Sequence, residues 1–231
     1  MSAPGPLVLL IEDEAEIRRF LRATLGAQGY RLIEAITGEE GIALAASHRP
    51  ELVILDLGLP DIDGISVAKR LREWSPVPII VLSARGQEGD KIAALDAGAD
   101  DYVTKPFGVG ELTARLRVAL RHARRGAEKD EPVFEVGALR VDQAHRRVTL
   151  DGREVRLTAL EYRLLQTLVH HSGRVVTHRQ LLKEVWGPAS AEQTHYLRVY
   201  MHQLRNKLEP DPARPRYLRT EQGVGYRLAD E

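Results

Sequence analysis

The sequence predicts an α/β protein of two domains, a doubly wound five-stranded parallel sheet followed by a smaller α+β domain. Three observations predict this arrangement. The 231 residues, 43% of them apolar, are enough for two hydrophobic cores. The first half of the chain alternates apolar runs with helical patterns. The second half changes to short strand-like pieces, three helical segments and a hairpin.

Five strand candidates and five helix candidates alternate in the first half. The runs at 7–11, 52–55 and 79–82 have the length and nearly continuous apolarity of strands buried on both faces, and 31–35 and 101–103 are weaker candidates. Helical periodicity fills the stretches at 14–28, 38–47, 65–74, 87–97 and 110–124. This alternation indicates a parallel sheet with helices on both faces.

A charged stretch at 122–132, nearly without apolar residues and ending in Pro132, indicates the end of a helix and then a linker. It divides the chain into a first domain at 1–122, a linker at 123–132 and a second domain at 133–231.

The second domain begins with strand-like pieces at 134–136, 139–141 and 147–150. Three helical segments follow, and they are separated at Gly173, Gly187 and Pro210. Thr177 is the predicted N-cap of the second of these helices. The chain then closes with a hairpin at 217–228.

Charge is distributed unevenly, although the formal net charge is zero. Residues 1–110 carry 11 Lys and Arg against 17 Asp and Glu, a balance of −6, whereas 174–227 carry 10 against 5, a balance of +5. An acidic half and a basic half indicate different partners. The absence of cysteine excludes disulfides and thiolate metal sites. No apolar run approaches the ~18 residues of a membrane span, and the first residues lack the basic region of a signal peptide, so we expect a cytoplasmic protein without a membrane partner.

Polar side chains follow the predicted strands at the edge where an open parallel sheet binds its ligands. Strands often end in polar residues at the solvent, which would explain any one of these side chains. It does not explain why three carboxylates, a hydroxyl and an amine converge at one edge. They are Glu12 and Asp13, Asp56, Ser83, and Lys105.

This set of side chains favours magnesium and phosphoryl chemistry. Crowded carboxylates require a counter-charge, and Mg²⁺ prefers a few carboxylate or carbonyl oxygens. A carboxylate beside Mg²⁺ and a lysine is the arrangement that forms an aspartyl phosphate, and Ser83 can donate to a new phosphoryl oxygen. No glycine-rich nucleotide cradle follows the first strand, so the phosphoryl donor is not expected to be a nucleotide bound here.

In this order, the residues resemble the receiver domain of two-component response regulators, a flavodoxin-like fold, and the resemblance covers residues 6–122. It implies a sensor histidine kinase as phosphoryl donor and Asp56 as phosphoacceptor, in a domain that catalyses only its own phosphorylation and dephosphorylation. The implied magnesium site comprises Asp13, Asp56 and the Gly58 carbonyl, with Glu12 acting through water. The implied phosphoryl-binding and switch residues are Ser83, Lys105 and Tyr102, and Lys105-Pro106 stands where the family has a cis peptide bond.

The last two helices and last strand of the first domain form a second candidate surface. Taken alone, its residues favour an ordinary solvated face. The subgroup of receivers with a winged-helix output uses this face for a symmetric active homodimer, and pairs such as Lys91 with Glu111 and Asp101 with Arg115 suit a self-complementary patch. The predicted dimer residues are Lys91, Ile92, Leu95, Asp100, Asp101, Glu111, Ala114 and Arg115.

The third helix of the second domain, predicted at 191–208, has an apolar stripe and an opposite face suited to DNA. Leu197, Met201, Leu204 and Leu208 form the stripe. The other face carries imidazole, amide and guanidinium groups that can reach base edges and phosphates in a major groove. With the basic hairpin, the predicted DNA-contact residues are His195, Arg198, Val199, Tyr200, His202, Gln203, Arg205, Arg219 and Arg227.

Residues 133–229 resemble the winged helix-turn-helix output domain of OmpR/PhoB response regulators, and the closing Gly223-Val-Gly-Tyr-Arg227 is typical of that subgroup. Four further stretches, at 56–61, 72–78, 91–101 and 195–201, are similar to regulators of potassium-uptake operons. The resemblance implies double-stranded promoter DNA as a partner.

The prediction is therefore a phosphorylation-activated transcription regulator, and two alternatives remain. A dehalogenase-like aspartyl-phosphate phosphatase or phosphotransferase also uses a strand-end Asp and Mg²⁺, but it requires a second Asp where this chain has Gly58. A phosphorylation-switched interaction module without DNA binding is the other alternative. The face of His195, Val199 and His202 and the basic hairpin argue against that module.

Overall fold

The computed structural model describes residues 5–84, 88–127, 133–190 and 194–230. The chain divides into two compact units, Met1–Ala127 and Glu128–Glu231. Residues 128–132 of the predicted linker and 191–193 of the predicted third helix lie outside the described residues.

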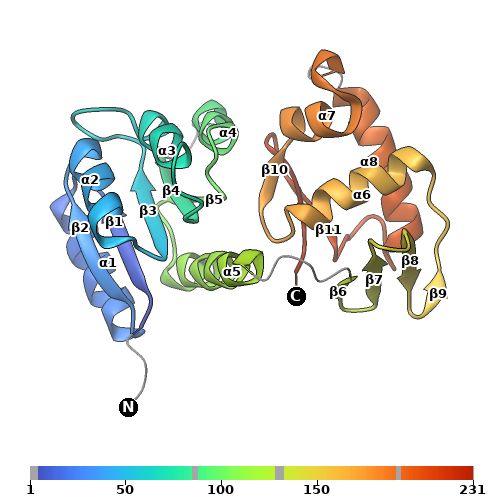
Figure 1. Cartoon of the computed structure of the whole chain (residues 1–231), viewed down its shortest axis with the longest axis horizontal. Helices are drawn as coiled ribbons and strands as arrows, with labels where there is room; N and C mark the ends of the chain where they lie inside the picture. Colours follow the sequence, from blue (N-terminus) through green and yellow to red (C-terminus); the bar gives the residue numbers. More distant parts are fainter. Residues whose placement is uncertain (1–4, 85–87, 128–132, 191–193, 231) are drawn as a thin grey trace. The chain divides into compact units, whose positions relative to one another are not determined.

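The first unit is a five-stranded parallel sheet in the order β2-β1-β3-β4-β5 (Figure 1). Its strands are β1 (Leu7–Ile11), β2 (Arg31–Ala35), β3 (Leu52–Asp56), β4 (Ile79–Ala84) and β5 (Asp101–Lys105). Its helices are α1 (Ala15–Ala27), α2 (Gly38–His48), α3 (Gly64–Arg72), α4 (Glu88–Asp96) and α5 (Val109–Ala127). The predicted doubly wound fold is confirmed.

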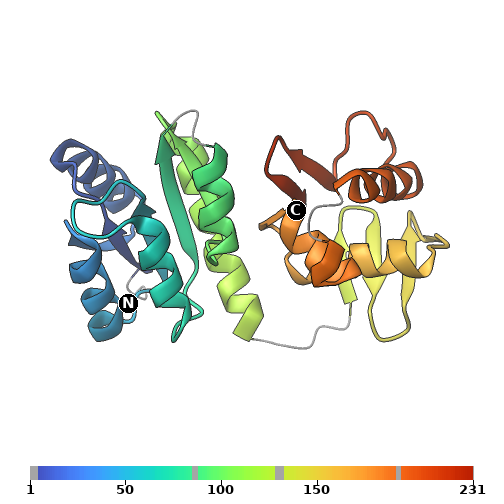
Figure 2. The same cartoon turned by 90° about the horizontal axis from the view of Figure 1, so that it is seen from above.

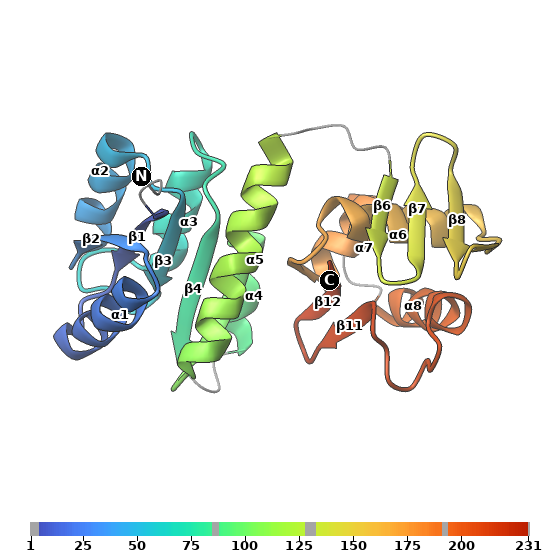
Figure 3. The same cartoon turned by 90° about the horizontal axis from the view of Figure 1, so that it is seen from below.

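Helices cover both faces of this sheet, which explains why its central strands are apolar throughout. The four residues from Leu52 to Leu55 in β3 are completely buried. Leu21 and Leu25 of α1 and Leu112 and Leu116 of α5 pack in one core with the sheet, and α2, α3 and α4 lie on the other face (Figure 3). Because the strands are parallel, all five carboxyl ends meet at one edge.

The second unit contains a four-stranded antiparallel sheet, three helices and a three-stranded sheet (Figure 2). The first sheet comprises β6 (Val133–Val136), β7 (Leu139–Asp142), β8 (Arg147–Leu150) and β9 (Arg153–Glu154). The helices are α6 (Ala159–His170), α7 (His178–Trp186) and α8 (Thr194–Leu208), with a short 3₁₀ turn at Pro188–Ser190. The second sheet, in the order β10-β12-β11, comprises β10 (Val175–Thr177), β11 (Leu218–Glu221) and β12 (Gly225–Leu228).

Local sequence fixes the ends of the helices in this unit. Thr158 and Thr177 each form a capping box, in which the threonine side chain accepts from the backbone N–H of Glu161 and Gln180 respectively. Gly187 ends α7 with a positive φ of 97°. The predicted N-cap at Thr177 and the helix end at Gly187 are therefore confirmed.

Three details differ from the expected boundaries. Helix α5 continues to Ala127, beyond the boundary expected at residue 122. Strands β9 and β10 were not predicted. Strand β9 consists of two exposed residues, and β10 consists of three residues that become a strand only by pairing with β12. Gly225 permits that pairing, since a Cβ atom there would lie 2.0 Å from the Val176 carbonyl oxygen.

Candidate functional site

The carboxylates predicted at the strand ends meet in the structure. Glu12 and Asp13 follow β1, and Asp56 ends β3. One carboxylate oxygen from each lies within 4.8 Å of the others. Glu12 is completely buried and Asp56 is 7% exposed, whereas Asp13 is exposed at the mouth. This set of hard oxygen donors fits a divalent cation such as Mg²⁺.

Lys105, at the end of β5, is the counter-charge of this cluster. Its Nζ lies 2.8 Å from Asp56 Oδ1 and 3.0 Å from Glu12 Oε2, and the exposed Glu14 carboxylate is 3.4 Å away. The Lys105 side chain is 19% exposed. One ammonium therefore faces three carboxylates, which leaves the site with an excess of negative charge.

The pKa values follow from this crowding. Burial raises the pKa of Glu12, and the neighbouring negative charge of Asp56 raises it further. Burial alone would lower the pKa of Lys105, but its hydrogen bonds to Asp56 and Glu12 leave that pKa raised. The lysine is thus held charged, while the site disfavours a further ionised carboxylate.

The predicted residues Gly58, Ser83 and Lys105 lie at the same edge of the sheet as Asp56. Gly58 donates its N–H to Asp56 Oδ2 at 3.1 Å. Ser83 is 1% exposed, and its hydroxyl oxygen has no hydrogen-bond partner among the described residues. The Lys105-Pro106 peptide bond is cis, as the resemblance implied. A buried hydroxyl without a partner at this edge fits a site that receives an additional oxygen-rich group.

Arg18 of α1 is a positioning residue that the sequence reasoning missed. Its Nη1 donates to the carbonyl oxygens of Glu12 at 2.9 Å and Asp13 at 2.5 Å, so it holds the loop that carries both acids. The only signal in the sequence is its place in the first turns of the helix that follows the acids.

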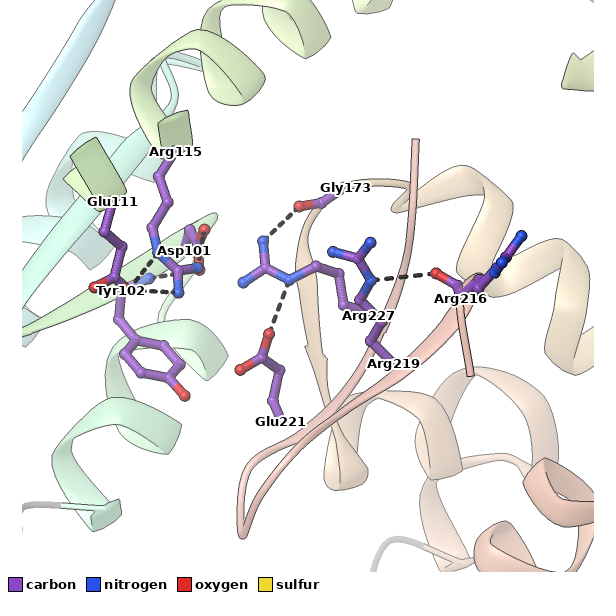
Figure 4. A network of polar contacts seen from close by, with 9 residues as sticks. All are labelled: Asp101, Tyr102, Glu111, Arg115, Gly173, Arg216, Arg219, Glu221 and Arg227. Atoms are coloured by element: carbon purple, nitrogen blue, oxygen red, sulfur yellow. Dashed lines mark hydrogen bonds and ion pairs between the residues drawn. The ribbon is translucent and has the colours of Figure 1, made fainter. Parts of the chain in front are cut away.

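On the predicted dimer surface, charges pair within one chain. Arg115 Nη1 lies 2.8 Å from Asp101 Oδ2, and Arg115 Nη2 lies 2.9 Å from Glu111 Oε1 (Figure 4). Lys91 Nζ lies 5.0 Å from the centre of the Tyr102 ring, which joins α4 to the predicted switch aromatic. Glu111 and Ala114 are exposed, and Lys91, Ile92 and Arg115 are partly exposed.

Three of the predicted dimer residues, Leu95, Asp100 and Asp101, offer little surface in this structure, and their part in a dimer stays a prediction. Asp100 is 5% exposed, and its Oδ2 accepts from Arg72 Nη2 at 2.6 Å and from the Ile79 N–H at 2.8 Å. It therefore ties α3 to the start of β4. Leu95 is 1% exposed.

Helix α8 presents the polar face that its sequence predicts. Leu197, Met201, Leu204 and Leu208 are buried in the core of the second unit. The predicted contact residues His195, Arg198, Val199, His202 and Gln203 are exposed on this helix. Tyr196, which was not predicted as a contact, is 55% exposed beside them.

Three predicted DNA-contact residues have structural partners instead. The Tyr200 ring packs 5.4 Å from that of Trp186, at the core. Arg205 donates to the Leu218 carbonyl oxygen from both Nε and Nη2, and burial lowers its pKa. Those two residues and Arg227, described next, have partners from distant parts of the chain, and their contacts with DNA stay predictions.

Figure 4 shows the two hairpin arginines in different settings. Arg227 Nε lies 3.0 Å from Glu221 Oε1, and its Nη1 donates to the Gly173 carbonyl oxygen at 2.8 Å. Its side chain is only 11% exposed. Arg219 is exposed and donates a 3.2 Å hydrogen bond from Nε to the Arg216 carbonyl oxygen, so its charge remains accessible to a ligand.

Comparisons with known proteins agree with this geometry. Residues 8–117 match the model of the response regulator receiver domain, and residues 152–228 match that of the C-terminal domain of transcriptional regulatory proteins. The chain is 56% identical over 221 residues to the KDP operon transcriptional regulatory protein KdpE of Escherichia coli (strain K12), covering 96% of this chain and 98% of that protein.

Other relatives are similar over nearly the whole chain. The transcriptional regulatory protein KdpE of Mycobacterium tuberculosis (strain ATCC 25618 / H37Rv) is 54% identical, with 96% of this chain and 98% of that protein covered. A solved structure from a family described as redox sensors in the streptococci that evolved from two-component response regulators is 28% identical and covers 98% of this chain and 100% of that chain, with a TM-score of 0.50. None of the described helices is long and apolar enough to cross a membrane. The chain therefore belongs to the response regulators of OmpR/PhoB type, as a KdpE-like transcriptional regulator with a receiver domain and a winged-helix DNA-binding domain.

Proposed function

We propose that this regulator accepts a phosphoryl group on Asp56 from the phosphohistidine of a sensor histidine kinase, and that phosphorylation promotes its binding to promoter DNA. One observation carries the proposal. The nearly buried Asp56 carboxylate lies 2.8 Å from the Lys105 ammonium and beside two further carboxylates that can share a cation with it.

In the proposed reaction, a carboxylate oxygen of Asp56 attacks the phosphorus atom as the phosphorus–nitrogen bond breaks. The imidazole leaves with the electron pair and takes up a proton. Lys105 donates to the transferred phosphoryl group, and the Ser83 hydroxyl gains the acceptor it lacks in this structure. Water later hydrolyses the aspartyl phosphate and restores Asp56, so the receiver turns over only its own phosphoryl group.

Mg²⁺ fits the same edge. Asp13, Asp56 and the Gly58 carbonyl would hold it, with Glu12 reaching it through water. When bound, it neutralises carboxylate and phosphoryl charge that Lys105 alone does not balance.

The proposed activation step changes the predicted dimer surface of the receiver, which α4, β5 and α5 form. A phosphoryl group on Asp56 that accepts a hydrogen bond from Ser83 would draw Tyr102 inward and away from the Lys91 ammonium that lies over its ring. Two receivers would then pair through α4, β5 and α5. Arg115 would exchange its partners Asp101 and Glu111 for the same residues of a second chain.

The DNA-contact proposal keeps the exposed residues. His195, Val199, His202 and Gln203 would read base edges, while Arg198 and Arg219 would hold phosphates. Because the KdpE proteins of E. coli and M. tuberculosis are similar over nearly the whole chain, control of a potassium-transport operon from the cytoplasm is the regulatory role that we propose.

Intact-mass spectrometry tests the phosphorylation proposal. With Mg²⁺ and acetyl phosphate, the wild-type protein should gain one acid-labile phosphoryl group and Asp56→Asn should gain none. Asp61→Asn, a matched change in the same loop but outside the cluster, should still be phosphorylated. A phosphorylated Asp56→Asn protein would reject the assignment of Asp56.

Sedimentation of the phosphorylated protein tests the dimer proposal. Ile92→Asp places a charge on the partly exposed apolar position of α4, so the variant should be phosphorylated normally and remain a monomer. An undiminished dimer would place the interface elsewhere on the protein.

A further inference from the structure

Helix α8 ends at a buried carboxylate that receives an unusual number of backbone donors. Glu209 is 6% exposed, and its own N–H donates to the Arg205 carbonyl oxygen at the last turn of the helix. Its Oε2 accepts from the N–H of Arg216 at 2.7 Å, and its Oε1 accepts from those of Tyr217 at 2.9 Å and Leu218 at 2.6 Å. A carboxylate at a helix C-terminus is otherwise unfavourable, so these three bonds give it a specific task.

Arg205, in the last turns of α8, holds the other side of Leu218. Arg205 donates to the Leu218 carbonyl oxygen from Nε at 3.0 Å and from Nη2 at 2.6 Å, and Nη2 also donates to Thr220 Oγ1 at 2.6 Å. The guanidinium lies 5.6 Å from the centre of the Tyr226 ring. Glu209, the residue that follows α8, therefore holds the N–H of Leu218, and Arg205 of α8 holds its carbonyl oxygen.

Leu218 begins β11, which is the edge strand of the sheet formed by β10, β12 and β11. An edge strand has outward backbone groups without a strand partner, and here the side chains of Arg205 and Glu209 supply partners at Leu218. The exposed Arg219 follows directly. Its position relative to His202 and Gln203 on α8 is thus set by bonds from the helix to the strand.

We infer that Arg205 and Glu209 are positioning residues that fix the wing, β11 and β12, on the base-reading helix α8. The helix and the phosphate-holding Arg219 then meet DNA as one unit. This inference rests on the proposed DNA contacts of α8 and Arg219. Glu209 acts through backbone alone, since it is buried and has the same sign of charge as a phosphate.

A double-mutant cycle tests the inference in the full-length protein. Fluorescence anisotropy at low salt measures the Kd for random-sequence duplexes, at a temperature where circular dichroism shows every variant folded. Glu209→Gln removes the charge and one acceptor with little change of shape, and should raise Kd about tenfold, equivalent to about 1.4 kcal/mol. In an Arg219→Ala background the same change should raise Kd less than about threefold, because the residue being positioned is gone.

Gln203→Ala is the matched control background. It leaves the wing arginine in place, so Glu209→Gln should keep its full effect on random-sequence DNA. Equal effects of Glu209→Gln in the wild-type and Arg219→Ala backgrounds would mean that it acts by general destabilisation, and would overturn the inference.

Arg205→Lys separates positioning from direct phosphate contact. It keeps the charge but removes the planar fork that bonds Leu218 and Thr220, so Kd should rise although the net charge is unchanged. Wild-type affinity in this variant would show that Arg205 serves only as a point charge.

Amide hydrogen exchange tests the contacts without DNA. Glu209→Gln should accelerate exchange of the N–H groups of Arg216, Tyr217 and Leu218 while leaving those of α6 unchanged. If the wild-type protein bound no DNA, the proposed DNA contacts would be wrong. Amide exchange would still test the hydrogen bonds that Glu209 accepts from Arg216, Tyr217 and Leu218. Unchanged exchange at all three amides would refute them. If Glu209→Gln did not fold, the Arg205→Lys measurement would decide alone.

Discussion

The receiver domain gathers carboxylates around one lysine at a largely buried site, whereas the winged-helix domain spreads polar side chains over the exposed face of α8. At the receiver edge, Lys105 faces the carboxylates of Glu12, Asp56 and Glu14 within 3.4 Å. On α8, the imidazole and amide side chains of His195, His202 and Gln203 are exposed. The first site thus depends on buried electrostatics and the second on solvent-accessible shape.

This difference determines how each site responds to mutation. In the receiver, the functional groups also belong to the buried ion network, so removing one disturbs both stability and chemistry. In the winged-helix domain, stability resides in the α8 stripe of Leu197, Met201, Leu204 and Leu208, and the opposite face is available for contacts. Stability and recognition should therefore separate there. Four measurements test this contrast between the two domains.

Lys105→Met should produce the largest effect. The change leaves the Glu12 and Asp56 carboxylates without their cation, and loss of one partner from a largely buried ion network costs about 3–5 kcal/mol. Urea unfolding of the receiver should show this loss, and millimolar Mg²⁺ should restore part of it. A variant as stable as wild type without Mg²⁺ would show that the carboxylates do not need the lysine.

Leu204→Ala should be nearly as destabilising in the other domain. Leu204 is completely buried between the helices, and removal of its side chain should cost about 2–5 kcal/mol in the unfolding free energy. The adjacent, exposed Gln203→Ala is the control and should change stability by no more than about 0.5 kcal/mol. Equal losses in the two variants would contradict the division of α8 into a stripe and a face.

Gln203→Ala and Arg219→Ala should weaken DNA binding in different ways. The first should cost about 1–3 kcal/mol on cognate DNA alone with little change in salt dependence. The second should weaken cognate and random duplexes alike and reduce the slope of log affinity against log salt by about one. Binding titrations at several salt concentrations measure both, and equal slopes would remove the distinction between base reading and phosphate holding.

Asp61→Asn should have the smallest effect, and that effect should be present at neutral pH and disappear in acid. Hydrogen bonds from the backbone N–H groups of Glu39 and Gly38 lower the pKa of Asp61 to about 2, from an ordinary 3.8. The stability that ionised Asp61 contributes is therefore fully present above the ordinary pKa and is lost as the pH falls toward 2. The stability difference between wild type and variant should shrink over that interval. A difference independent of pH would exclude the charge of Asp61 as its cause.

Sequence patterns were sufficient wherever a residue's role follows from its own strand or helix. The alternation of five strand patterns with five helix patterns predicted a parallel sheet, and parallel strands necessarily bring their carboxyl ends together. The sequence alone could thus predict that one edge of the sheet brings together Glu12, Asp13, Asp56 and Lys105. The α8 stripe was equally accessible, because helical spacing alone separates its buried and exposed positions.

Tertiary structure decided which charged and aromatic side chains are available to a ligand. Arg205, Arg227 and Asp100 are charged residues of the kind that usually contacts ligands at a surface. Here Arg205 bonds Leu218, Arg227 bonds Gly173, and Asp100 bonds Arg72. These partners lie 13 to 54 positions away in the chain, and no local period encodes such pairings. The sequence by itself therefore determined the fold and the chemistry of the receiver edge. Only the packing of distant segments decided which arginines remain for DNA and which hold the protein together.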